Sequence, residues 1–260
     1  MPVTYSSYLK LDELLSLQQP LSKGPEHDEM LFIIIHQVYE LWFKEVIHEM
    51  DYLQRLFAEN KTSLAQHTLK RVLTILKVMV AQLDILETMT PLEFLSFRDR
   101  LESGSGFQSS QFRELEFLLG LKNHKSFSRF PQGSQARQQL EMRYERPSLW
   151  DSFLQYLAFN NYDIPQHVLS RDLTKPVQVS KEVQKILIDI YRNNSIMTQI
   201  CERLVDLDEG FQEWRYRHVK MVQRTIGTKH GTGGSAGAEY LMKTLNKPVF
   251  PDLWAIRTEL

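Results

Sequence analysis

Two of the eight histidines occupy positions where a buried cofactor could be bound. His36 shares a helix face with Phe32, four residues before it, and with Tyr39, three residues after it. His218 lies on the apolar face of another long helical segment, four residues after Trp214. Either histidine alone could be a core residue with a satisfied hydrogen bond. Two of them on two long helices favour a buried metal or haem, because the core of a helix bundle commonly holds such cofactors.

Motif spacing narrows the kind of metal site. The sequence contains neither the H-E-x-x-H motif of zinc proteases nor the C-x-x-C-H motif of covalently attached haem. Glu45 and His48 form one E-x-x-H unit, but a di-iron bundle needs a second copy, and no other histidine has a glutamate three residues before it. Cys201 lies in an apolar helical run and is interpreted as a packing residue. Histidine is therefore the expected axial ligand of a bound haem.

Basic side chains near these positions suit the carboxylates of a ligand or a cofactor. Phe94 and Arg98 lie four residues apart in FLSFRDRL, so an aromatic ring and a guanidinium project from one helical face. The stretch EWRYRHVKMVQR surrounds His218 with cations that could neutralise haem propionates. Each pattern has an ordinary alternative, which is an arginine lying over a phenylalanine at the surface or a solvated helix face.

A glycine-rich loop follows the second histidine. Residues 226–241 read IGTKHGTGGSAGAEYL, and four of the eleven glycines of the chain lie between Gly231 and Gly237. The loop does not complete the phosphate-binding motif G-x-x-x-x-G-K-[ST], and the segment before it is helical rather than a strand. A flexible surface loop and a loop whose backbone approaches a ligand remain as interpretations.

The helices that must position these residues are predicted by apolar residues at steps of three and four. Three long helices are expected over residues 25–57, 62–88 and 195–227. Shorter helices are expected at 9–17, 92–101, 111–120, 135–145, 149–159 and 181–193. The predicted fold class is all-α, a single domain over residues 1–260 built on long antiparallel helices.

Composition excludes several classes of protein. The chain has 260 residues, a formal net charge of -1 and one cysteine, so nothing indicates a nucleic-acid partner, a disulfide framework or a thiolate metal cluster. The N-terminus lacks a signal-peptide pattern, and no apolar run approaches about 20 residues. A cytoplasmic protein with no membrane partner is expected.

Four stretches of the sequence resemble one known family. HDEMLFIIIHQVYELWFKE, FLSFRDRLESGSGFQSSQFR, EWRYRHVKMVQRTIGTKHGTGGSAG and the opening TYSSYLKLDELLSLQ look like tryptophan 2,3-dioxygenases, in order and over almost the whole chain. The resemblance implies an all-helical homotetramer whose helices enclose a pocket for non-covalently bound haem b. It also implies that this ferrous haem and O2 convert L-tryptophan to N-formyl-L-kynurenine, the first step of the kynurenine pathway.

The same resemblance assigns residues to the cofactor. His218 in YRHVKMV is the expected axial ligand of the haem iron, and Trp214 lies near a propionate. Ser105 and Gly106 of SGSGF pass near the haem edge.

It also assigns residues to the substrate. His36 is the expected catalytic histidine and positions the indole N–H, without having to act as a base. Arg98 binds the carboxylate with Phe94 beside it, and Thr232 contacts the amino-acid end, where Gly233 and Gly234 let the loop come close. The remaining pocket residues are expected to be Phe32, Ile33, Ile34 and Ile35 and, from the N-terminal segment 1–20 of a neighbouring subunit, Tyr5 and Tyr8.

Two positions depart from the family pattern, and three other functions stay open. Some relatives have tyrosine at the position of Phe94, so Arg98 binds the carboxylate with less help, and many have serine at the position of Ala236. The alternatives are a haem monooxygenase of the same fold acting on a modified indole, a haem or indole sensor without turnover, and a di-iron bundle.

Overall fold

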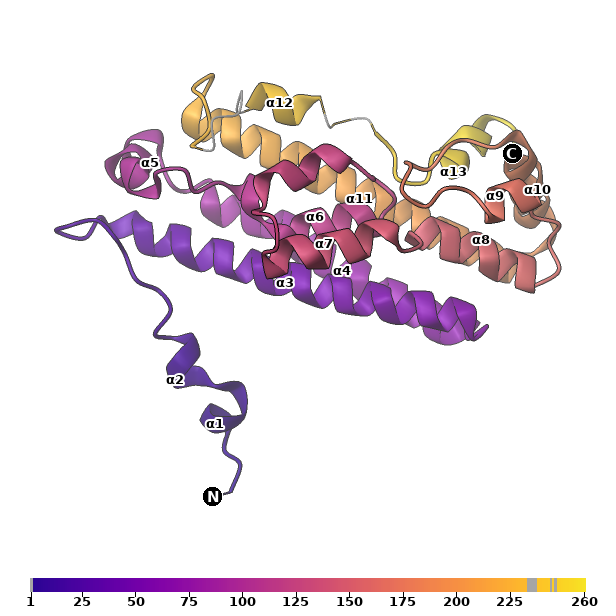
Figure 1. Ribbon diagram of the computed structural model, residues 1–260, viewed down its shortest axis with the longest axis horizontal. Helices are drawn as coiled ribbons and strands as arrows, with labels where there is room; N and C mark the ends of the chain where they lie inside the picture. The colour runs from indigo at the N-terminus through magenta and orange to yellow at the C-terminus, as the bar shows by residue number, and fades with distance from the viewer. Residues whose placement is uncertain (1, 233–237, 244, 246) are drawn as a thin grey trace.

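The computed structural model of the chain describes residues 2–232, 238–243, 245 and 247–260. Within these ranges every regular element is a helix, which confirms the predicted all-α class (Figure 1). The α-helices are α1 (Tyr5–Leu9), α2 (Leu11–Leu14), α3 (His27–Ala58), α4 (Thr62–Leu86), α5 (Pro91–Arg98), α6 (Ser110–Leu118), α7 (Gln135–Glu145), α8 (Leu149–Phe159), α9 (Gln166–Leu169), α10 (Lys181–Asn193), α11 (Ser195–Ile226), α12 (Ala238–Met242) and α13 (Pro251–Ala255). Short 3-10 helices lie at Asp99–Leu101, Gly106–Gln108, His124–Arg129 and Ile256–Thr258.

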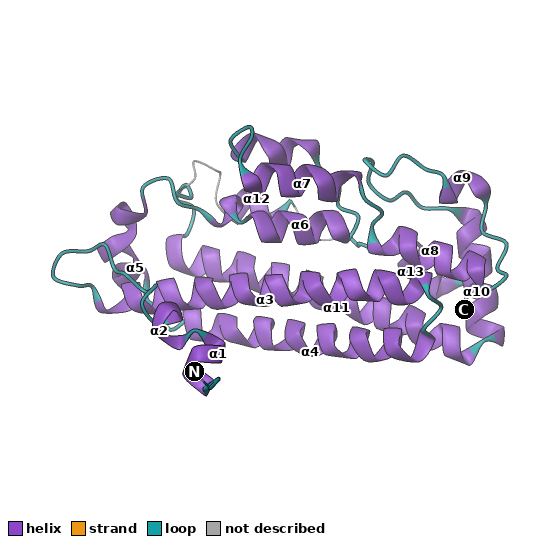
Figure 2. Cartoon of the chain, turned by 60° about the horizontal axis from the view of Figure 1, so that its bottom comes forward, coloured by secondary structure: helices purple, strands orange, loops and turns teal. Residues whose placement is uncertain are grey.

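Three long helices, α3, α4 and α11, lie side by side and form the frame of the molecule (Figure 2). On α4 the residues Leu69, Val72 and Leu76 recur at steps of three and four, and all three are buried. This helix packs along both α3 and α11. The ends of all three helices lie within two residues of the predicted ones, because their apolar periodicity is long and uninterrupted.

A tight turn reverses the chain between α3 and α4. Asn60 adopts a left-handed conformation with φ 54°, and the Lys61 N–H donates to the Leu56 carbonyl at 2.8 Å. The side chain of Asn160 donates to that of Asn60 at 2.9 Å and so ties the turn to the end of α8. The turn therefore sets the antiparallel pairing of two of the three long helices.

An ion network centred on the buried Arg143 holds α6 and α7 against α3. Arg143 of α7 donates to both carboxylate oxygens of Asp51 on α3, at 2.8 Å for Nη2–Oδ2. It also donates to Glu114 of α6 at 3.0 and 2.8 Å, from Nε and Nη2. Removing one partner of such a buried set would leave a desolvated charge, so the network fixes the position of α6. Phe112 and Arg113, which directly precede Glu114 in α6, line a cavity next to α3.

Asp208 anchors the C-terminal segment to the middle of α11. This side chain is 0% exposed and accepts hydrogen bonds from the backbone N–H groups of Val249 and Phe250 at 2.8 and 2.9 Å. It also accepts from the indole of Trp254 and the side chain of Gln212, at 2.9 and 2.7 Å. Four donors on one buried carboxylate hold α13 against the bundle.

The N-terminal segment extends away from the bundle as an arm (Figure 1). The single helix predicted over residues 9–17 is wrong: α1 and α2 are separated by Lys10, whose left-handed conformation, φ 54°, ends one helix before the next begins. Neither α1 nor α2 contains a buried residue. The remaining short helices match the predictions closely at α5 to α8 and α10, whereas α9, α12 and α13, each of four or five residues, were not predicted.

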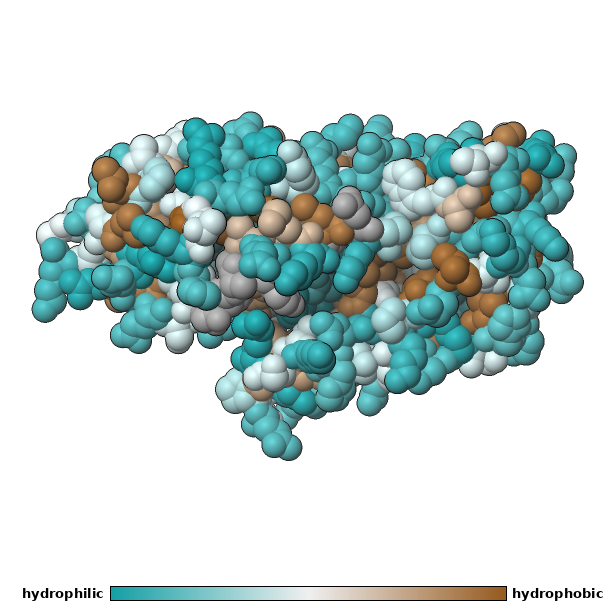
Figure 3. Space-filling model, turned by 90° about the horizontal axis from the view of Figure 1, so that it is seen from above, coloured by the Kyte–Doolittle hydropathy of each residue, from teal (hydrophilic) through white to brown (hydrophobic). Residues whose placement is uncertain are grey.

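Hydrophilic residues dominate the face of the molecule seen in Figure 3, where hydrophobic residues form separate patches among them. Within the described ranges, no helix combines the length and the apolar character needed to cross a membrane.

Candidate functional site

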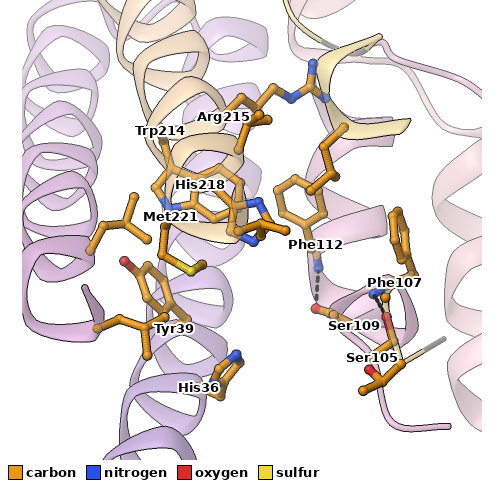
Figure 4. A pocket seen from close by; sticks show the side chains of 18 of the residues that line it. His36, Tyr39, Ser105, Phe107, Ser109, Phe112, Trp214, Arg215, His218 and Met221 are labelled. Carbon is orange, nitrogen blue, oxygen red and sulfur yellow. Dashed lines mark hydrogen bonds between the residues drawn. The ribbon is translucent and has the colours of Figure 1, made fainter. Parts of the chain in front are cut away.

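A cavity of about 590 Å³ lies between α3, α11 and the segment that connects α5 to α6. Side chains from these three parts of the chain point into it from different sides (Figure 4). Its lining includes Phe32, His36, Tyr39, Glu40, Phe43, Phe94, Arg98, Gly104, Ser105, Gly106, Phe107, Ser109, Phe112, Arg113, Glu116, Trp214, Arg215, His218, Met221, Val222, Gly231 and Thr232. The structure thus gathers into one cavity residues that are far apart in the sequence.

His218 presents a neutral imidazole to this cavity from α11. Burial, together with the smaller effects of the nearby charges of His36 and Arg113, lowers its pKa to about 4. Its ring lies flat against the indole of Trp214, one turn earlier, with centroids 5.3 Å apart and planes 8° apart. A neutral histidine with a fixed ring orientation is the form that binds a metal ion.

His36 faces the same cavity from α3. Its ring is surrounded by protein yet accessible from the cavity. Burial lowers its pKa, although the hydrogen bond to Phe32 and the charge of Glu40 act in the opposite direction. The Nδ1 atom lies 2.7 Å from the Phe32 carbonyl oxygen, which can only accept, so Nδ1 carries the proton in the neutral ring. The unprotonated Nε2 is therefore available to accept a hydrogen bond from a ligand N–H.

Aromatic rings line the wall next to His36. The Phe32 ring lies 4.1 Å from the His36 ring and 5.8 Å from that of Phe94, measured between centroids. Phe97 completes the group, 5.5 Å from both phenylalanines in edge-on arrangements. This apolar wall of aromatic rings suits a planar aromatic ligand whose polar edge points at His36.

Two polar side chains link the loop after α11 to the segment after α5. Arg98 Nη2 donates to the His230 carbonyl at 2.5 Å, and Thr232 Oγ1 donates to the Gly104 carbonyl. Gly104 is required for the turn that it forms with Leu101, because a Cβ there would lie 2.9 Å from the Leu101 carbonyl oxygen. A guanidinium and a hydroxyl thus lie together at the cavity wall, where they can bind a carboxylate or an ammonium group.

A buried charge cluster lies at another part of the cavity wall. Arg113 and Arg215 donate to the two carboxylate oxygens of Glu116, with 2.7 Å between Arg215 Nη2 and Glu116 Oε1. Two guanidinium groups on one carboxylate leave a net positive charge facing the cavity. Arg215 lies in the basic stretch predicted to face propionates, whereas Arg113, the last residue of FLSFRDRLESGSGFQSSQFR, and Glu116 were assigned no role from the sequence.

The cavity fits a haem group. His218 offers an unprotonated nitrogen, the flat rings of Trp214 and Phe112 line the wall, and the Arg113 and Arg215 guanidiniums suit anionic propionates. Ser105 and Gly106 also line this cavity, as predicted for the cofactor edge. In the described part of the chain, no group of three or more His, Cys, Asp or Glu residues is placed to hold a metal ion by itself.

Several predicted site residues lie elsewhere. Ile33, Ile34 and Ile35 do not line the cavity, because successive helical residues point about 100° apart and Phe32 and His36 already occupy the facing side. Ile35 is instead buried in the core, and Ile34 is exposed.

The remaining predicted residues belong to the arm and to the glycine-rich loop. Tyr5 and Tyr8 lie on the arm, exposed and outside the cavity of their own chain. Gly233, Gly234 and Ala236 lie outside the described residues.

The arginines in the basic stretch around His218 face two different parts of the structure. Arg215 faces the cavity, whereas Arg217 pairs with Asp84 of α4 and with Glu87, the residue after that helix, at 2.5 and 3.4 Å. Arg224 pairs with the same Glu87 at 3.3 Å. Helical periodicity thus leaves one arginine of the stretch at the cavity, and the others stabilise the contact between α11 and α4.

Comparison with known proteins adds to this geometry. A family model described as tryptophan 2,3-dioxygenase matches residues 1–142 and 185–260, which include every cavity-lining residue except Pro176. A protein of Herpetosiphon aurantiacus named tryptophan 2,3-dioxygenase is 60% identical over 258 residues, covering 99% of this chain and 98% of its own length. Proteins of the same name from an Anaeromyxobacter strain and from Caulobacter vibrioides are 54% and 44% identical, each over 99% of this chain and over 96% and 98% of their own lengths.

Proposed function

Because this chain belongs to the tryptophan 2,3-dioxygenase family, we propose that the cavity between α3 and α11 is the site where L-tryptophan is oxidised. The chain is an oxidoreductase of the dioxygenase class, and its reaction inserts both atoms of O2 and opens the indole ring to give N-formyl-L-kynurenine. The observation that carries the site assignment is the pair of neutral histidines, His36 and His218, facing one cavity from two helices.

His218 would hold the iron of haem b, and the Arg113–Glu116–Arg215 cluster would balance the propionate charge. When bound, ferrous haem would supply the oxygen chemistry that amino-acid side chains lack. Trp214 would keep the His218 imidazole in one orientation by lying against it. Ser105 and Gly106 would line the cofactor edge.

The protein's own contribution is to orient the substrate. Arg98 would pair with the carboxylate and Thr232 would contact the amino-acid end, each exchanging its present backbone carbonyl for the ligand. Phe32 and Phe94 would enclose the indole, and Nε2 of His36 would accept its N–H. Orientation of this kind can lower a barrier by about 7–11 kcal/mol at most.

We further propose, from the family resemblance, that four copies assemble in the cytoplasm and that the arm of one copy, residues 1–20, reaches the site of its neighbour. Tyr5 and Tyr8 would then close that pocket, which agrees with their exposure in the single chain. The whole of residues 1–260 acts as one domain in this proposal.

The test is to reconstitute the protein with haem, reduce it, and add L-tryptophan and air. Growth of the N-formylkynurenine absorbance, with product mass above tryptophan by two oxygen atoms, supports the proposal. A product with one added oxygen from a substituted indole would indicate the monooxygenase alternative. Haem and indole binding without any product would indicate a sensor.

A further inference from the structure

The base of the N-terminal arm is fastened to the first turns of α3. Residues 17–22, which are the end of the arm and the two residues after it, run beside the start of that helix and are held at two points by side chains of α3. Beyond these points the arm, with α1 and α2, leaves the body of the molecule (Figure 1).

Glu29 makes the first attachment. Its carboxylate accepts hydrogen bonds from the backbone N–H groups of Leu21 at 2.6 Å and Ser22 at 3.0 Å, and from the Ser22 hydroxyl. The Ser22 Oγ in turn accepts from the Glu26 N–H at 3.0 Å, which closes a loop through Gly24, whose φ is 81°. Glu29 is 2% exposed, so an isolated carboxylate would be costly there without these three donors.

The protonation state of Glu29 agrees with this geometry. Burial raises its pKa, but the hydrogen bonds from Ser22 and Leu21 outweigh burial, and the net effect is a lowered pKa. The side chain is therefore ionised at neutral pH, and each of its bonds to the arm is charge-assisted.

Gln37 makes the second attachment, directly after the site residue His36. Its Oε1 accepts from the Gln18 side chain at 2.6 Å, and its Nε2 donates to the Leu17 carbonyl at 3.2 Å. Eight residues of helix separate Gln37 from Glu29, about 12 Å along the axis. Because the two attachments are this far apart, they fix both the position of residues 17–22 and the direction in which they run along α3.

The arm carries large apolar side chains that its own chain does not cover. Tyr5 and Tyr8 are 77% and 76% exposed, and Leu15 and Leu17 are exposed as well, as is Leu21 just after the arm. Large apolar side chains exposed at this density are expected to be covered by a partner, and the proposed function supplies a second copy of this chain.

We propose that Glu29 is a positioning residue, which holds residues 21 and 22 so that the arm leaves the body in the direction that places Tyr5 and Tyr8 at a neighbouring copy's site. The inference rests on the proposed function for the docking of the arm. The attachment itself is independent of haem, substrate and turnover.

The experiment compares Glu29→Gln and Ser22→Ala with the unsubstituted, haem-loaded protein. Glu26→Gln is the matched control, because it removes the same charge from an exposed side chain three residues away. The first readout is amide hydrogen exchange of Leu21 and Ser22, followed by mass spectrometry. The second is KM for L-tryptophan measured separately from kcat.

Glu29→Gln should speed exchange at these two amides by roughly tenfold or more, since a charge-assisted hydrogen bond is lost, while exchange in α4 stays unchanged. Ser22→Ala should give a smaller increase, and Glu26→Gln should give none. KM should rise severalfold in Glu29→Gln, with haem content unchanged and a smaller change in kcat.

Unchanged exchange in Glu29→Gln would overturn the attachment. Faster exchange with an unchanged KM would overturn the positioning role. Absence of product from the unsubstituted protein would contradict the proposed function instead, and the exchange rates would then decide on Glu29 alone.

Discussion

The imidazole of His218 and the indole of Trp214 lie parallel on successive turns of α11, with ring centroids 5.3 Å apart and planes 8° apart. Trp214 is itself held by edge-on contacts to Tyr39 and Phe43 of α3, at 6.2 and 6.0 Å. The packing of α3 against α11 therefore fixes the plane of the histidine that faces the cavity. A core contact of this kind sets the direction of a ligand lone pair, which a flexible surface histidine could not do.

His36→Ala should reduce turnover by about tenfold to a hundredfold while haem content and the ferrous spectrum stay unchanged. The reason is that in the proposed site Nε2 of His36 would position the substrate and would not hold the cofactor. Steady-state kinetics and a haem assay on the same preparation check both parts. Full activity in this variant would remove His36 from the mechanism.

Arg98→Ala should raise KM for L-tryptophan by about a hundredfold, because the substrate carboxylate would lose a charged partner. Arg98→Lys keeps the charge but loses the paired donors, so an intermediate KM is expected. Tryptamine, which lacks the carboxylate, should bind all three proteins alike. An unchanged KM in Arg98→Ala would place the carboxylate elsewhere.

Phe94→Tyr should lower KM for L-tryptophan by about threefold to tenfold, since one added hydroxyl can supply one hydrogen bond to the carboxylate. Phe94 lines the cavity together with Arg98, so the hydroxyl can reach the ligand without entering the core. Binding of tryptamine serves as the control and should not change. An equal effect on both ligands would point to altered packing rather than to a carboxylate contact.

Asp208→Ala should lower the free energy of unfolding by about 3 kcal/mol or more, because four donors lose their shared buried acceptor. Asp208→Asn retains one acceptor oxygen and should be less destabilised. Urea unfolding followed by circular dichroism measures both. A loss below about 0.5 kcal/mol in Asp208→Ala, the range of ordinary surface substitutions, would contradict the anchoring role.

The long helices could be predicted from sequence because their apolar spacing is a local property. The same holds for α7, α8 and α10, whose ends were predicted to the residue at Gln135–Glu145, Leu149–Phe159 and Lys181–Asn193. The helices of the arm were predicted less well, because the left-handed conformation of Lys10, which separates α1 from α2, does not change the spacing of apolar residues. Helices of four or five residues, such as α9 and α13, are too short to show a period at all.

The site was predicted in part. His36 and His218 could be singled out because each lies on an apolar helix face, and the structure brings both to one cavity. The Arg113–Glu116–Arg215 cluster could not, because it joins α6 to α11 across 99 residues of sequence. Glu29 was not predicted either, because two of its donors are the backbone N–H groups of Leu21 and Ser22, which residue types do not reveal.

The assignment of His218 as the haem ligand is tested by the optical spectrum of the reduced, haem-reconstituted protein and of His218→Ala, with and without added imidazole. His48→Ala, which removes an exposed histidine of α3, is the control. The unsubstituted protein and the control should show the spectrum of five-coordinate, histidine-ligated ferrous haem. His218→Ala should lose that spectrum, and imidazole should restore it in part. An unchanged ferrous spectrum in His218→Ala would contradict the central claim that this residue is the ligand of the haem iron.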